Sequence, residues 1–288
     1  MSSIKRDLRS LLGQGLAFSV LLFYTFLALL PLYLMIVSSL IPLGVTFDVN
    51  DLQLYPRNPS LNNLFAFNHR VSGYLGRWLI NSAIVSTLPV ATNILFGVMA
   101  GYALGKMRFP GSRFLFWLMI ATMTIPQFVI LIPLYEMVWQ FNWNDTYTAL
   151  IVPFMAGIAT VFLSRQFVQT LPGELLESAT MDGCGEWGLF WHIILPLSRP
   201  LLGVLAIMGF VGAWLEYFWT YLVIDSRAMY TVQMGILGVL GVDGGYAGEL
   251  DYGEIMAASL VASIPVICVF FAAQRHFVKG ITFGGIKG

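Results

Sequence analysis

Long apolar runs alternate with short polar segments along most of the chain. A helix needs about 20 mostly apolar residues to cross roughly 30 Å of hydrocarbon. The runs that meet this requirement are residues 16–40, 79–104, 114–136, 147–164, 201–223 and 255–274. The pattern therefore predicts an all-α, polytopic membrane protein with six transmembrane helices.

Several of these runs contain proline, which would break a helix in water. The fourth run is the weakest, because Pro153 and Gly157 interrupt it. The other prolines inside the runs are Pro31, Pro89, Pro126, Pro133 and Pro265. Membrane helices tolerate proline when neighbouring groups satisfy the freed carbonyls. Each break is compatible with a moving part or with a simple packing kink.

The first run has one feature of a secretory signal, because Lys5, Arg6 and Arg9 precede it. Its apolar stretch is far longer than the roughly 7–15 residues usual in such a signal, and no clear small-residue cleavage site closes it. We therefore expect an uncleaved first helix.

Composition agrees with a membrane protein. Of the 288 residues, 58% are hydrophobic and 10% are charged, whereas a soluble domain carries about 25% charged residues. The formal net charge is zero, so charge gives no case for nucleic-acid binding. Cys184 and Cys268 have no metal-ligand spacing, and we expect neither a disulfide nor a zinc site.

Loop charges orient the predicted bundle. With the N-terminus inside, the inner segments hold Lys5, Arg6, Arg9, Lys106, Arg108, Arg113, Arg165, Arg199, Arg275, Lys279 and Lys287. The outer segments hold Arg57, Arg70, Arg77 and Arg227. The positive-inside rule then predicts a cytoplasmic N-terminus (1–15), a membrane domain (16–274) with the loop 165–200 inside the cell, and a cytoplasmic tail (275–288).

The outer segments are uneven in length. Residues 41–78 are polar, and residues 224–254 are acidic and rich in glycine. Such a loop either contacts an extracytoplasmic partner or is a solvated connector.

A polar island, Glu177-Ser-Ala-Thr-Met-Asp182-Gly183, interrupts the apolar sequence and is followed after nine residues by Ile193-Ile-Leu195-Pro196. Residues 174–182 predict a short helix with carboxylates in its first turns, where the helix dipole favours them. An apolar stripe runs along it at helical spacing and consists of Leu175, Leu176 and Ala179. Gly183 is the expected left-handed C-cap. Such a helix either fits a groove on a partner or lies flat on lipid.

This segment resembles the EAA loop of ATP-binding-cassette (ABC) importer permeases. The family pattern is Glu-Ala-Ala, three residues, Gly, nine residues, Ile-x-Leu-Pro. The residues that match it at the same spacing are Glu177, Ala179, Gly183, Ile193, Leu195 and Pro196. Asp182, directly before the glycine, also matches a common form of the family pattern. Ser178 departs from the usual Ala, a small-for-small change. The resemblance implies the type I importer permease fold and a cytoplasmic coupling helix that docks on ATPase subunits.

Further features are similar to the maltose-permease G-like half of the carbohydrate-uptake subfamily, over about residues 15–288. They are Asn81-Ser82, Phe109-Pro110-Gly111 and a glycine-rich tail that runs from Phe277 to Gly288. The tail residues that the resemblance places against the ATPase are Lys279, Gly284, Gly285, Lys287 and Gly288. The implied partners are a sister permease, an ATPase homodimer that binds ATP and Mg, an extracytoplasmic solute-binding protein and a sugar. No cofactor is expected in this chain.

Candidate solute contacts lie in the fifth run and comprise Trp214, Glu216, Tyr217 and Trp219. A carboxylate deep in a membrane costs about 2.5–3.5 kcal/mol, so it tends to face a cavity or a partner. The aromatic rings would then stack on sugar faces. The alternative is an interfacial aromatic belt with Glu216 near the outer surface. The family often has Asn where Leu215 stands, which weakens this match.

Other functions fit less well. Gly101-Tyr-Ala-Leu-Gly105-Lys106-Met107 has too few residues between its glycines and lacks the Ser or Thr of a phosphate loop. A stand-alone secondary transporter predicts ionisable relays in several runs, and an intramembrane enzyme predicts paired His or carboxylates at depth. Glycerol-phosphate is the nearest alternative substrate, although no Lys or Arg lies deep in a run.

Overall fold

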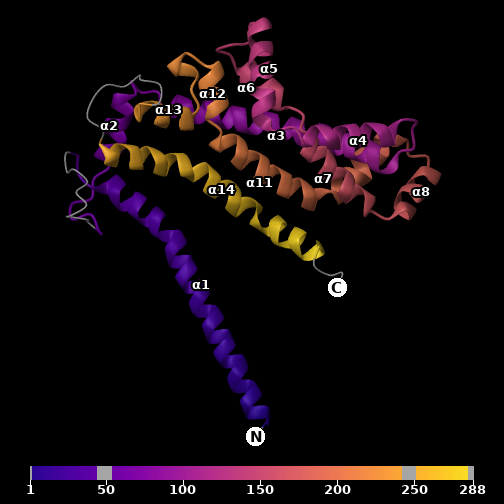
Figure 1. Ribbon diagram of the computed structural model, residues 1–288, viewed down its shortest axis with the longest axis horizontal. Coiled ribbons are helices and arrows are strands. Elements are labelled where there is room, and N and C mark those ends of the chain that lie inside the picture. Colours follow the sequence, from indigo (N-terminus) through magenta and orange to yellow (C-terminus); the bar gives the residue numbers. More distant parts are fainter. Residues whose placement is uncertain (1, 44–53, 242–250, 285–288) are drawn as a thin grey trace. The chain divides into compact units, whose positions relative to one another are not determined.

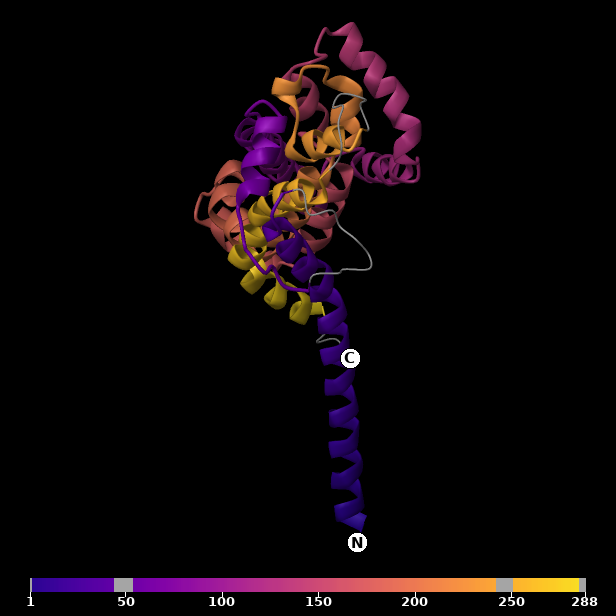
Figure 2. The ribbon, with the colours of Figure 1, turned by 90° about the vertical axis from the view of Figure 1, so that its left-hand side faces the viewer.

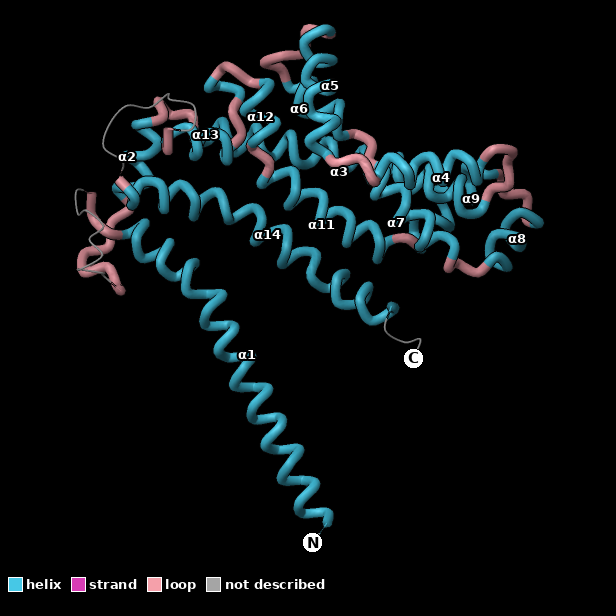
Figure 3. Tube along the Cα trace, in the orientation of Figure 1, coloured by secondary structure: helices cyan, strands magenta, loops and turns pink. Residues whose placement is uncertain are grey.

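The computed structural model describes residues 2–43, 54–241 and 251–284, with side chains described between 13 and 272. Helices joined by loops and turns make up the secondary structure of these residues, with no strand among them (Figure 3). The predicted all-α class is thereby confirmed. The chain divides into two compact units, Met1–Gly73 with Tyr246–Val261, and Tyr74–Gly245 with Ala262–Gly288.

The helices follow one another along the chain (Figure 1). The α-helices are α1 (Ser2–Leu40), α2 (Asn62–Arg70), α3 (Leu75–Lys106), α4 (Ser112–Met123), α5 (Gln127–Gln140), α6 (Tyr147–Ile151), α7 (Ile158–Gln169), α8 (Gly173–Met181), α9 (Glu186–Leu189), α10 (Leu195–Leu197), α11 (Arg199–Leu215), α12 (Phe218–Val223), α13 (Val232–Val239) and α14 (Tyr252–Gly284). The 3-10 turns are η1 (Val152–Phe154) and η3 (Arg227–Met229), and η2 (Phe190–Ile194) is a π-helix.

Four helical segments are long and apolar enough to cross a membrane in the described chain. They are Gly13–Leu40, Leu75–Lys106, Tyr147–Gln169 and Tyr252–Ala272. Two bent pairs bring the total to six if each pair is one span: Ser112–Met123 with Gln127–Gln140, and Glu186–Leu197 with Arg199–Leu215. Six runs were expected, and the third of them is bent within its length. The second bent pair has an angle of 73° and bends at residue 198, before the expected fifth run begins.

The bend in the third run and the early end of the fifth run each have a local cause. The third run turns by 99° between α4 and α5, where Pro126 is extended with ψ 138°. The fifth run was expected to continue to residue 223, but α11 ends at Leu215 because Glu216 is extended with ψ 128°. The Glu216 carboxylate accepts a hydrogen bond from the Trp219 N–H at 2.7 Å and so caps the start of α12.

The first unit is held together by polar contacts of two side chains. Buried Asn63 on α2 donates from Nδ2 to the Ser39 carbonyl at 2.9 Å and to the Ile41 carbonyl at 2.6 Å, which fixes the end of α1. Arg70 donates to both oxygens of Glu254 at 2.6 and 3.0 Å and so ties α2 to the start of α14. The hydrogen bond with Glu254 raises the pKa of Arg70 above its ordinary value.

The second unit is organised around α3, which packs mainly on α7 and α11 (Figures 1 and 2). Gly97, Gly101 and Gly105 recur every fourth residue on the side of α3 that faces α7. A Cβ at Gly101 would lie 2.5 Å from the Ser164 Cβ and 2.7 Å from the Arg165 backbone nitrogen. Small residues at this spacing let helix backbones approach closely in membranes. The glycines that superficially resembled a phosphate loop therefore form a helix contact.

One end of α3 holds the η3–α13 segment by hydrogen bonds. Asn81 donates from Nδ2 to the Ala228 and Tyr230 carbonyls, both at 2.9 Å, and its Oδ1 accepts from the Tyr147 hydroxyl at 2.6 Å. The Ser82 hydroxyl oxygen accepts from the Val232 N–H at 2.8 Å. The Asn81-Ser82 pair therefore links three segments that are far apart in sequence.

Replacing Gly101 by alanine should destabilise the second unit, because the new methyl group meets the α7 backbone. Overpacking of this kind costs about 1–3 kcal/mol, and we expect a lower thermal unfolding temperature for the purified protein. Gly76→Ala is the matched control on the same helix, since nothing lies within 4 Å of its Cβ position. It should leave the unfolding temperature unchanged or raise it slightly. Equal unfolding temperatures for the two variants would contradict the close contact.

Candidate functional site

The predicted polar island forms helix α8, at one end of the second unit (Figure 1). Pro172 precedes the helix, and Gly183 follows it with φ +86°. The Gly183 N–H donates to the Thr180 carbonyl at 3.0 Å, and the Cys184 N–H donates to the Ala179 carbonyl at 2.9 Å. These two bonds are those of a Schellman motif, which requires a left-handed residue at the glycine position. The predicted helix and its glycine cap are both confirmed.

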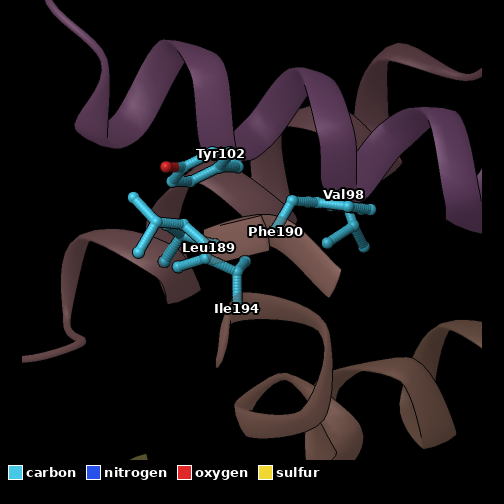
Figure 4. Packing of buried hydrophobic residues seen from close by; sticks show 6 residues of the cluster. Val98, Tyr102, Leu189, Phe190 and Ile194 are labelled. Atoms are coloured by element: carbon cyan, nitrogen blue, oxygen red, sulfur yellow. The ribbon is translucent and has the colours of Figure 1, made fainter. Parts of the chain in front are cut away.

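The inner side of α8 rests on a buried cluster, which we call the docking core. Its members are Val98, Tyr102, Val168, Leu189, Phe190 and Ile194 (Figure 4). Leu176 and Ala179 pack against it. Leu175, expected on the same apolar stripe, is instead 49% exposed. Glu177, Ser178 and Asp182 are exposed as well. The outer side of the helix is therefore acidic with isolated apolar side chains.

The Ile193-x-Leu195-Pro196 motif lies in and beside the π-helix η2. Ile193 and Leu195 are partly buried against the docking core, while Ile194 between them is completely buried. The Leu195 N–H donates to the Phe190 carbonyl, the wider bond of a π-helix. Pro196 follows at the start of α10 and has no N–H to extend that ladder. Sequence reasoning missed Phe190 and Ile194, whose burial shows only in the packed structure.

Polar bonds join the end of α3 to this segment. The Tyr102 hydroxyl donates to Glu186 Oε2 at 2.6 Å. Lys106 Nζ donates to the Leu171 carbonyl at 2.6 Å, and Arg165 Nε on α7 donates to the Leu104 carbonyl at 3.1 Å. The first two bonds tie residues 171–195 to the end of α3, and the third ties α7 to α3. The sequence signal for Tyr102 was its place between Gly101 and Gly105, which had been considered only as part of a phosphate loop.

The four candidate solute residues separate into two groups. Glu216 and Trp219 line a cavity of about 290 Å³ within the second unit. Trp214 is 2% exposed, and its Nε1 donates to the Ala262 carbonyl at 3.0 Å. Tyr217 is 41% exposed and does not line the cavity. Of the three aromatic candidates, Trp219 is therefore the one that lines the cavity.

Other predicted residues lie partly beyond the described chain. Lys279 and Gly284 belong to the backbone of α14. Gly285, Lys287 and Gly288 lie outside the described residues, as does 242–250 of the acidic outer segment. The predicted contact of this tail with an ATPase stays a prediction.

A bundle of membrane-crossing helices that carries an exposed, capped helix between two of its segments is the architecture of a membrane transport subunit. The chain belongs to the family of binding-protein-dependent transport system inner membrane components, whose profile matches residues 93–283.

Curated relatives extend the match to nearly the whole chain. The chain is 31% identical to the arabinooligosaccharides transport system permease protein AraQ of Bacillus subtilis, over 93% of this chain and 94% of the relative. It is 32% identical to the sn-glycerol-3-phosphate transport system permease protein UgpE of Yersinia pestis, over 88% and 91% of the two chains.

A solved structure supports the fold. A bacterial ABC transporter involved in the import of the acidic polysaccharide alginate superposes with a TM-score of 0.79 at 21% identity, over 91% of this chain and 96% of that one. The expected ABC importer permease fold is confirmed. The chain is a permease subunit of the inner membrane, in a class whose members are not themselves enzymes.

Tyr102→Phe should loosen the segment 184–195, because it deletes one hydrogen bond and keeps the ring in the docking core. Such a bond contributes about 1 kcal/mol, or roughly fivefold faster amide exchange if opening is local. Hydrogen exchange read by mass spectrometry measures this directly. Tyr24→Phe, at a residue 73% exposed, is the matched control. Adding Glu186→Gln to Tyr102→Phe should have little further effect, and full additivity would show that the two side chains act independently.

Proposed function

We propose that this chain is one pore subunit of an ATP-driven importer for a carbohydrate, and that α8 couples it to the ATPase. The observation that carries the coupling role is the seating of α8, capped by Gly183 and packed on the docking core, with its outer side free. Arabinooligosaccharide transport in the relatives supports a sugar substrate. The glycerol-3-phosphate permeases among the relatives support a phosphorylated polyol as the alternative.

The outer side of α8 favours a protein groove over lipid as its partner. Helices that lie on membranes carry Lys and Arg on their polar face, whereas α8 carries Glu174 and Glu177 and no cation. Leu175 and Met181 are 49% and 89% exposed and supply isolated apolar anchors. A short helix with a few apolar anchors fits a hydrophobic groove on another protein.

The proposed mechanism is alternating access. ATP closes the paired ATPases, and their grooves carry α8 inward. The docking core and the Tyr102–Glu186 bond pass this displacement to α3. Because α3 packs on α7 and α11, these helices move with it and open the pore toward the loaded binding protein. Hydrolysis then resets the pore.

The predicted orientation completes this proposal. Both termini and the loop 165–200 lie in the cytoplasm, where the ATPase homodimer binds ATP and Mg. In this arrangement a sister permease forms the other half of the pore, a solute-binding protein delivers sugar from outside, and no nucleic acid is involved. The residues that contact the ATPase are Glu177, Ser178, Asp182 and Gly183 outside the docking core, with Lys279, Gly284, Gly285, Lys287 and Gly288 from the tail. Ala179, Ile193, Leu195 and Pro196 position them.

An N-terminally tagged pull-down from native membranes tests the assembly. We expect an ATPase pair and one sister permease by mass spectrometry, and a binding protein after crosslinking. The tag avoids the C-terminus because the tail is proposed to contact the ATPase. A lone chain or a homo-oligomer under these conditions would instead favour a stand-alone transporter.

Gly183→Ala and Gly183→Asp should uncouple transport from ATP hydrolysis while the protein still inserts in the membrane. A side chain at φ +86° is strained by about 1–2 kcal/mol, which lowers the ratio of capped to uncapped geometry roughly 5- to 30-fold. Transport per ATP hydrolysed, measured in proteoliposomes, should fall, by that factor at most.

Gly185→Ala is the matched control, because its φ is −78° and nothing lies within 4 Å of its Cβ position. It should transport as the parent protein does. Normal transport by Gly183→Asp would refute the coupling role of the cap.

A further inference from the structure

Two tryptophans are exposed on the segment that leads from α8 to α11. Trp187 is 66% exposed and Trp191 is 47% exposed, whereas Leu189 and Phe190 between them are buried in the docking core. The two tryptophans are four residues apart, so they lie on the same side of the helical segment. One side of the segment is thus packed on the docking core, and another side is aromatic and uncovered within the described chain.

The exposed side is held in a fixed position. The Trp191 ring meets the Phe190 ring edge to face, with centroids 5.2 Å apart. Phe190 in turn lies 6.3 Å from the Tyr102 ring on α3. Trp187 directly follows Glu186, which accepts the hydrogen bond from the Tyr102 hydroxyl. Both tryptophans are therefore attached, through their neighbours, to the end of α3.

The bend before α11 determines how deep the two tryptophans lie. Residues 186–197 and α11 meet at 73°, and membrane helices tilt by about 20° from the bilayer normal on average. If α11 crosses the membrane, the segment before it lies closer to the membrane plane than to the normal. A straight helix would place Trp187 roughly 18 Å further from the membrane than Arg199. The bend instead keeps both tryptophans near the depth at which α11 begins.

The charges of this segment differ from those of α8. Interfacial segments combine Trp on one side with Lys or Arg on the polar side. The acidic residue within 184–199 is Glu186, which already accepts a hydrogen bond. Arg199 is exposed and has no ion pair among the described residues, and a guanidinium group binds phosphate well. In contrast, α8 carries Glu174 and Glu177 and no cation.

We propose that Trp187, Trp191 and Arg199 form a lipid-binding edge that seats residues 186–198 in the headgroup region of the bilayer. The occupant of this surface is phospholipid, with the indole rings among the upper acyl chains and Arg199 against phosphate. Tryptophan favours this depth because its ring is apolar and its N–H bonds to water or headgroup oxygens. The edge rests on the membrane location of the chain and not on the coupling role of α8.

Photocrosslinking in the complete transporter, in phospholipid nanodiscs, identifies the occupant directly. Trp187 and Trp191 are replaced, one at a time, by the photoreactive aromatic residue p-benzoylphenylalanine. We expect a phospholipid adduct at each position, read as a mass increase of the permease chain. Met181 on α8 is 89% exposed and is the matched control. The same replacement there should crosslink to the ATPase and give no lipid adduct.

The outcomes separate this inference from the proposed function. Protein adducts without a lipid adduct at positions 187 and 191, or no adduct at either, would overturn the lipid-binding edge. Lipid adducts there with no ATPase adduct at position 181 would leave the edge standing and contradict the coupling role of α8. ATPase activity of each complex reports that the variant is folded and assembled.

Hydroxyl-radical footprinting checks the same surface in the unmodified protein, because Trp and Met side chains are both readily oxidised. In nanodiscs we expect Trp187 and Trp191 to stay protected before and after the ATPase is stripped away. Met181 should become oxidised once the ATPase is gone. Trp214, which is 2% exposed, serves as the protected reference. Oxidation of Trp187 and Trp191 on loss of the ATPase would show that a protein covers them, and would refute the lipid assignment.

Discussion

The close approach of α3 and α7 is the constraint on which the second unit depends. Without side chains at Gly97 and Gly101, the backbone of α3 rests almost directly on Thr160 and Ser164. In lipid, helices gain little from burying apolar surface against one another, so packing of this kind supplies much of their association. The same two helices carry the cavity wall at Asn93 and Thr160 and, further along α3, the docking-core residues Val98 and Tyr102. Both candidate sites are therefore built on one helix pair.

Much of the fold could be predicted from hydrophobic pattern alone, because lipid requires long apolar runs with satisfied backbones. The bends could not. Pro126 was visible as a break, but the sequence pattern does not specify the angle of 99° between α4 and α5. The early end of α11 depends on Glu216, whose carboxylate was considered for its charge and not for the backbone N–H that it accepts.

The candidate site also has parts that the sequence predicted and parts that it did not. Gly183 and the extent of α8 follow from local backbone rules, so sequence predicted them closely. Glu216 and Trp219 line a cavity, whereas Trp214 is directed toward Ala262 and Tyr217 does not line that cavity. Such directions depend on where one helix stops and the next begins. Phe190 and Tyr102 escaped notice because their role comes from partners distant in sequence.

The π-helix at Phe190–Ile194 has a consequence for how this segment tolerates change in length. A π-helical turn holds one more residue than an α-helical turn between hydrogen-bonded groups. The wider turn takes up that residue, so deleting one residue within Phe190–Ile194 would return the segment to regular α geometry and leave the turns on either side in place. A deletion in the α-helical turn before it, Glu186–Leu189, has no wider turn to take it up. In a regular helix it would rotate everything beyond it by about 100° and turn Ile194 away from Val98 and Tyr102.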